Sequence, residues 1–270
     1  MLPNRDATIF APEKILETAG IDFRIVDEEF AEKAHVVSVP SRFAGWRKYM
    51  NLIHRAYGSD AKKDIAKLLV TLELEKRIWA EQEEGISRFL TLARNHVGRP
   101  LTVFVNGMTA AANGNRFMEF DKIDMEENAI MDDIRRNSPC DTRFLRGFGK
   151  TMEEKIETLR SYGFYVGPFG SSSVISTVLN IPGVTYQNRH YINRTRKGPK
   201  IRHRIKVPAN KIRNVEDKEG IAANDGESFG GTNHNEKSMV GYSINPDIFA
   251  KIAIRHYKKV SNLNAPNGSA

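Results

Sequence analysis

Apolar residues in the first part of the chain recur at intervals of three and four, which is the period of an amphipathic helix. One stripe lies between positions 42 and 57, and its members are Phe43, Trp46, Met50, Ile53 and Tyr57. A second stripe follows the capping pair Ser59-Asp60, and its members are Ile65, Leu68, Leu69 and Leu72. The pattern therefore predicts that residues 41–97 are helical.

Beyond Pro100 the apolar runs become short, and Gly, Asn and Pro residues separate them. The spacing predicts two further helices, one at 123–136 that ends before Pro139 and one at 151–159. Strands are expected at 101–105, 143–148, 162–169, 201–207, 237–244 and 248–256. Helices that come first and strands that come later are typical of the α+β class.

The composition agrees with a globular protein and excludes several kinds of site. The 270 residues are 40% apolar and 27% charged, enough for an N-terminal helical region (1–98), a strand-rich domain (99–260) and a flexible tail (261–270). No stretch reaches the ~18 apolar residues of a membrane span, so we expect a cytoplasmic protein without a membrane partner. The single cysteine, Cys140, excludes an internal disulfide, and the seven histidines lie too far apart in sequence for a local metal site.

The positive charge of the chain is concentrated in one segment. Residues 189–213 hold ten Lys or Arg and no Asp or Glu, whereas the net charge of the whole chain is +8. We call these residues the basic segment. One basic segment in a nearly neutral protein indicates a local surface for an anionic partner, either a cofactor pyrophosphate or a target bound to nucleic acid. The alternative is a solvated loop and strand, and the sequence leaves both open.

Three short motifs in the second half of the chain bring polar groups onto expected strands. Arg146 lies in an apolar run and precedes Gly147, an arrangement that can hold a phosphate or carboxylate, although a structural ion pair would need the same residues. A serine run, 171–173, follows Phe169, and Glu236 ends a Gly-rich loop. The nearby Gly-Lys-Thr at 149–151 lacks the glycine that a phosphate-binding loop requires five positions earlier.

In this order the motifs resemble those of the mono-ADP-ribosyltransferase family of bacterial toxins and phage enzymes, in its Arg-Ser-Glu branch. The matches are Phe-Leu-Arg-Gly at 144–147, Phe-Gly-Ser-Ser-Ser at 169–173 and His-Asn-Glu at 234–236. Ser172 replaces the family's Thr, and His234 replaces its Glu or Gln. The likeness covers about residues 123–256, and it implies a catalytic domain built as a mixed or antiparallel β-sandwich.

The resemblance also implies a reaction, in which NAD is cleaved and its ADP-ribose is transferred to a protein target that can be associated with nucleic acid. The ribose passes through a cation-like state and nicotinamide leaves as a neutral molecule, so one carboxylate suffices and no metal is implied. Glu236 would stabilise that state, Ser171 would orient Glu236, and Arg146 would hold the NAD phosphates.

The remaining roles follow from the same resemblance. Besides Arg146 and Ser171, it places three residues in contact with NAD: Gly147, Phe169 and Ser173. Phe229 and His234 lie in the loop that would recognise the substrate. The alternative is a non-catalytic protein, either nucleic-acid-binding or a structural component of a virion, that uses the basic segment to bind phosphates. In that case the serine run is an ordinary turn and Glu236 is a surface carboxylate.

Overall fold

The fold is an α/β structure built on one parallel sheet. The computed structural model describes residues 14, 17–18, 20, 53–58, 61–72, 78–107, 109, 120–169, 173–187, 212–216 and 241–264. Six parallel strands lie in the order β3-β2-β1-β4-β5-β6. They are β1 (Asp64–Thr71), β2 (Thr102–Asn106), β3 (Arg143–Arg146), β4 (Tyr162–Pro168), β5 (Gly183–Gln187) and β6 (Ile212–Glu216). The expectation of an α+β protein with a mixed or antiparallel β-sandwich is therefore wrong.

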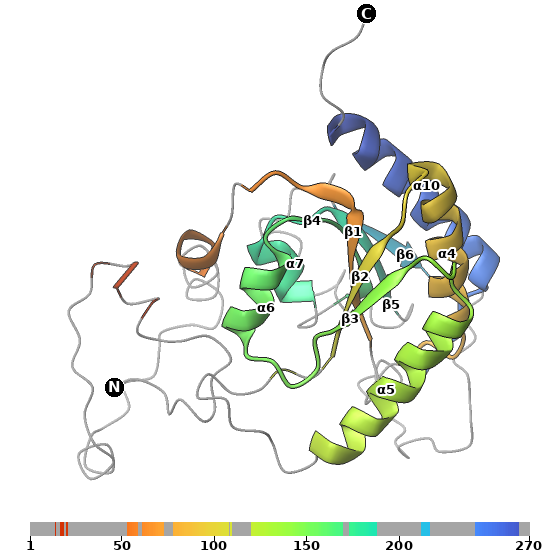
Figure 1. The fold of residues 1–270 in the computed structure, drawn as a ribbon, viewed down its shortest axis with the longest axis horizontal. Coiled ribbons are helices and arrows are strands. Elements are labelled where there is room, and N and C mark those ends of the chain that lie inside the picture. The colour runs from red at the N-terminus through yellow and green to blue at the C-terminus, as the bar shows by residue number, and fades with distance from the viewer. Residues whose placement is uncertain are drawn as a thin grey trace, which may run out of the picture.

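Helices cover both faces of the sheet, as parallel strands require because each must be joined to the next by a crossover. They are α4 (Gln82–Val97), α5 (Phe120–Arg136), α6 (Met152–Leu159), α7 (Val174–Val178) and α10 (Pro246–Asn264). In Figure 1, α4 and α10 lie on one side of the strands and α6 and α7 on the other. The buried apolar residues accordingly form two clusters, one on each face.

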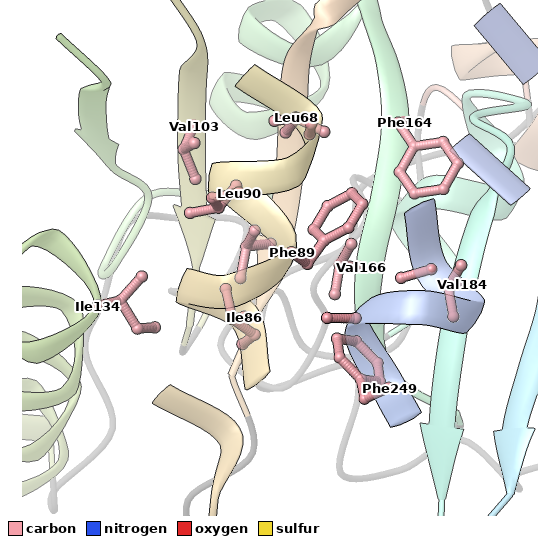
Figure 2. Packing of buried hydrophobic residues seen from close by; sticks show 14 of the residues in the cluster. Leu68, Ile86, Phe89, Leu90, Val103, Ile134, Phe164, Val166, Val184 and Phe249 are labelled. Atoms are coloured by element: carbon pink, nitrogen blue, oxygen red, sulfur yellow. The ribbon is translucent and has the colours of Figure 1, made fainter. Parts of the chain in front are cut away.

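The larger cluster lies under α4 and α10. Phe89 of α4 packs on Phe164 of β4 with ring centroids 5.8 Å apart, and Tyr257 of α10 meets both rings edge-on. Figure 2 shows Ile86, Phe89 and Leu90 of α4 facing the strands, with Ile134 of α5 beside them. This face of the sheet is apolar up to its carboxyl end, where Tyr186 contacts Trp79.

The second helix predicted in the first part of the chain is wrong, because residues 64–71 form β1. Its apolar residues satisfy a helical period, but a strand that is buried on both faces is also nearly continuous in apolar residues. Leu68 and Val70 enter the cluster under α4, and Leu69 enters the opposite cluster. The central place of β1 also means that residues from both sides of the expected boundary at 98 build one sheet.

The strand expected at 248–256 is also wrong, because these residues lie in α10. A proline and a cap begin a helix here instead. The Asn245 side chain accepts hydrogen bonds from the amides of Asp247 and Ile248, and Pro246 needs no partner for an amide. Buried residues then follow at helical spacing: Phe249, Ala253, Tyr257 and Val260.

Several local predictions are confirmed. Strands form at β2, β3 and β4, and helices form at α5 and α6, close to the expected bounds. Thr151 and Glu154 form a capping box at the start of α6. The strand expected at 201–207 lies outside the described residues.

Gly85 of α4 provides a test of the packing, because a Cβ at this position would overlap the ring of fully buried Trp79. Alanine favours a helix by about 1 kcal/mol over glycine. We nevertheless expect Gly85→Ala to lower the free energy of unfolding by about 1–3 kcal/mol, since overpacking moves the indole. Urea denaturation measures the change. Asn95→Ala, on the exposed side of the same helix, is the control and should lose nothing; a Gly85→Ala variant as stable as wild type would contradict this account.

Candidate functional site

The strand order reverses between β1 and β4. From β1 the sheet grows outward through β2 and β3, and from β4 it grows in the other direction through β5 and β6. The chain leaves β1 toward α4 on one face and leaves β4 toward α7 on the other. Connections that diverge in this way leave a crevice at the carboxyl ends of the two strands, and ligands of doubly wound sheets bind there.

Polar residues gather at this edge on the face of α6 and α7. Leu69, Phe104 and Tyr165 are part of the apolar cluster on this face. Two positions further along each strand, side chains on the same face are no longer apolar. The strand register sets Asn106 beside Thr71, and it sets Gly167 beside Thr185.

We call four of these residues the polar layer: Thr71, Asn106, Thr185 and Gln187. They are 3%, 6%, 0% and 5% exposed, so all four are buried, although Thr71, Asn106 and Gln187 are the last residues of their strands. Gly167 interrupts the layer on β4, where the hydroxyl of Tyr165 fills the place of a side chain and donates to the Pro168 carbonyl at 3.2 Å.

Two acceptor atoms of the polar layer have no hydrogen-bond partner among the described residues. Asn106 Nδ2 donates to Thr71 Oγ1 at 3.3 Å. The Tyr186 hydroxyl lies 3.1 Å from the Thr71 carbonyl oxygen and thereby holds the end of β1. Within the described part of the chain, neither Asn106 Oδ1 nor Gln187 Oε1 has a hydrogen-bond partner. A buried acceptor without a partner costs about 1–3 kcal/mol, so such atoms usually pair with an ordered water or with a ligand.

A buried ammonium group lies beside this edge, at the end of β2. Lys155 of α6 is fully buried, and its Nζ donates to the Gly107 carbonyl at 3.0 Å and to Thr109 Oγ1 at 2.8 Å. Burial lowers the pKa of Lys155 to about 7, Lys150 contributes to this lowering, and the charge of Glu127 opposes it. The ammonium therefore ties the chain that leaves β2 to α6.

The predicted site residues that the structure describes lie on two separate parts of this edge. Arg146 is the exposed last residue of the edge strand β3, and its guanidinium lies 5.4 Å from the centre of the Phe148 ring. The amide of Gly147 donates to the Val105 carbonyl at 2.8 Å. A Cβ on Gly147 would overlap the Phe104 ring, so close packing within the protein accounts for this glycine.

Phe169 follows β4 directly and Ser173 begins α7, whereas residues 170–172 between them lie outside the described residues. The amide of Phe169 donates to the Tyr186 carbonyl at 2.9 Å, and Ser173 is buried at the start of α7. Two strands, β2 and β1, separate β3 from β4, so Arg146 lies about 14 Å from the end of β4 at the usual strand spacing of about 4.8 Å. The structure does not bring Arg146 together with Phe169 and Ser173.

The other predicted site residues lie outside the described residues, and these are Ser171, Phe229, His234 and Glu236. The basic segment lies there too, except for the backbone of its last two positions in β6. Sequence reasoning missed the polar layer, although one signal was present. Asn106 follows the apolar run Val-Phe-Val at 103–105 directly and precedes Gly107.

A comparison with protein families, with curated proteins and with solved structures finds no match. None of the helices that the structure describes is long and apolar enough to cross a membrane. In the same residues, no group of three His, Cys, Asp or Glu side chains could hold a metal ion.

The lowered pKa of Lys155 predicts a pH dependence of stability. Between pH 7 and about 10 the unfolded chain keeps a proton on this amine that the folded chain has released, so the free energy of unfolding rises with pH, by up to about 1.4 kcal/mol per unit. Below pH 7 the cost of burying the charge is complete, and this slope vanishes. Urea denaturation at pH 7.5, 8.5 and 9.5 should show a smaller slope for Lys155→Met. Lys251→Met, at an exposed position of α10, should keep the wild-type slope; equal slopes for all three proteins would contradict the account.

Proposed function

We propose that this protein is a transferase that binds a nucleotide-linked glycosyl donor in the crevice between β1 and β4. The observation that supports this proposal is the reversal of strand order, with buried polar strand ends beside it. Sheets of this order hold nucleotides at the reversal, with the phosphates against a turn whose backbone amides are accessible. The Gly- and Ser-rich residues 167–173 follow β4 at this point and would form that turn.

Two features argue against a dinucleotide that serves as a redox cofactor. The residues after β1, Leu-Glu-Leu-Glu at 72–75, contain none of the glycines that bring a pyrophosphate close to the first strand. At the end of β2, where such proteins use an acidic residue to bind the ribose, this chain has Asn106. Neutral amide and hydroxyl groups instead suit the hydroxyls of sugars, which both donate and accept hydrogen bonds.

ADP-ribosyl transfer from NAD is the narrower form of this proposal. NAD is itself a nucleotide-linked glycosyl donor, and Phe169 and Ser173 follow β4 at the reversal of strand order. The bond between the anomeric carbon C1 of the transferred sugar and the leaving group breaks with its electron pair on the leaving group, which is nicotinamide for NAD and a nucleoside diphosphate for a nucleotide sugar. A nucleophile of the target forms the new bond to C1 and releases its proton to solvent. Glu236 would stabilise the positive charge on the sugar, and Ser171 would orient Glu236.

Donor turnover tests the proposal. The full chain is incubated with NAD, UDP-glucose, ADP-glucose or GDP-mannose and a cell lysate, and the release of nicotinamide or nucleoside diphosphate is measured. We expect one of these donors to be consumed. If it is NAD, Glu236→Gln should lower the rate about 10²- to 10³-fold, because the charge of the carboxylate is lost while its shape is kept. Glu227→Gln in the same loop is the matched control and should retain activity. Release of no leaving group from any of the four donors would refute the proposal.

The basic segment favours a second candidate function, nucleic-acid binding without catalysis. Under the first proposal this segment docks the target, so replacing Arg194, Arg196 and Lys197 by Glu should weaken target modification and leave turnover of the donor without target nearly unchanged. The effect should be larger at low salt. Tight binding to DNA or RNA that falls steeply with salt, without release of a leaving group, would support the second candidate instead.

A further inference from the structure

We propose that Asn106 and Gln187 are the specificity-determining residues of this crevice, and that their side-chain carbonyl oxygens accept hydrogen bonds from sugar hydroxyls of the donor. The inference rests on the proposed function, because it names which groups of a nucleotide-linked donor the polar layer recognises. The observation behind it is that Asn106 Oδ1 and Gln187 Oε1, at the carboxyl edge, have no hydrogen-bond partner among the described residues.

Both residues are more than nine-tenths buried, and both lie on the same face of the sheet. The orientation of the Asn106 amide is set by its own hydrogen bond, since Nδ2 donates to Thr71 Oγ1 and Oδ1 is the atom that remains. Thr71 is held in turn through its carbonyl oxygen by the Tyr186 hydroxyl. The acceptor on β2 is therefore positioned before a ligand arrives.

The chemistry of these atoms selects what can bind. A carbonyl oxygen accepts and cannot donate, so it pairs with a hydroxyl or an N–H group. Ionised phosphate and carboxylate oxygens have no proton to offer and would place negative charge against it. The phosphates of the donor are thus directed away from Asn106 and Gln187.

The positions of the two acceptors indicate that they bind different rings. Asn106 ends β2 and Gln187 ends β5, with β1 and β4 between them, so they lie about 14 Å apart at the usual strand spacing. This distance exceeds the width of one sugar ring. One oxygen would meet the ribose of the nucleotide and the other would meet the transferred sugar.

Calorimetric titration distinguishes the two rings. The probes are the donor that the wild type binds most tightly among NAD, UDP-glucose, ADP-glucose and GDP-mannose, its nucleoside diphosphate, and the 2′-deoxy form of that diphosphate. Asn106→Leu and Gln187→Met keep the approximate size of each side chain and remove the acceptor. One of these two variants should bind the diphosphate about 5- to 150-fold more weakly than the wild type does. The same variant should bind the diphosphate and its 2′-deoxy form with equal affinity. The other should weaken only the complete donor. Asn106→Asp and Gln187→Glu retain acceptor oxygens and should retain the preference for the hydroxyl.

Thermal unfolding without ligand decides whether the acceptors serve the protein or a ligand. Gln187→Met replaces an unpaired buried acceptor by an apolar group of similar shape and should leave the melting temperature equal or raise it. Asn106→Leu also removes the Nδ2 group that donates to Thr71, so its melting temperature is compared with that of Thr71→Val, which removes the same hydrogen bond from the other side. A melting temperature several degrees lower for Gln187→Met than for the wild type, or for Asn106→Leu than for Thr71→Val, would show that protein groups pair with the two oxygens, and would overturn the inference. Asn95→Leu, on the exposed side of α4, is the control for binding.

Failure of the inference can be separated from failure of the proposed function. If the wild type binds a nucleotide donor and the stable Leu and Met variants bind it equally well, the assignment of Asn106 and Gln187 is wrong and the function stands. If the wild type binds none of the four donors, the proposed function is refuted and this inference falls with it.

Discussion

The structure depends on one constraint, which is that the two central strands, β1 and β4, must be buried on both faces. Their parallel pairing requires helical crossovers, and these crossovers supply the helices that cover the sheet. Phe164 and Val166 of β4 face α4 and α10, while Tyr165 faces the opposite cluster. Because the strands contribute apolar side chains in both directions, neither layer of helices could be removed without exposing the core.

The same constraint gives the carboxyl edge its special character. The helices after β1 and β4 start on opposite faces, so no single helix covers the place where these two strands end. Hydrogen bonds replace apolar packing there, with Thr71 held by Tyr186 on one side and by Asn106 on the other. A buried layer of neutral polar groups is costly to build for stability alone, and its position at the reversal of strand order is where a ligand gains the most contacts.

The resemblance to ADP-ribosyltransferases implied the wrong scaffold. Phe169 and Ser173 follow the central strand β4, whereas Arg146 lies on the far edge strand. Short motifs of Arg, Ser and Gly show that a chain segment is polar and can adopt several backbone conformations. They contain little information about how strands pair. The nucleotide chemistry that they suggest is compatible with a parallel sheet.

The sequence by itself determined the elements whose signals are local. The capping box of Thr151 and Glu154 begins α6, and short apolar runs bounded by turn residues mark β2, β3 and β4. Only the tertiary structure decided that residues 64–71 form a strand and that α10 is a helix, because their apolar patterns fit either period and packing against distant segments selects one. It also decided that Asn106, Thr71 and Gln187 meet at one edge. Their burial depends on strands far apart in the sequence, and no local pattern contains the order in which those strands pair.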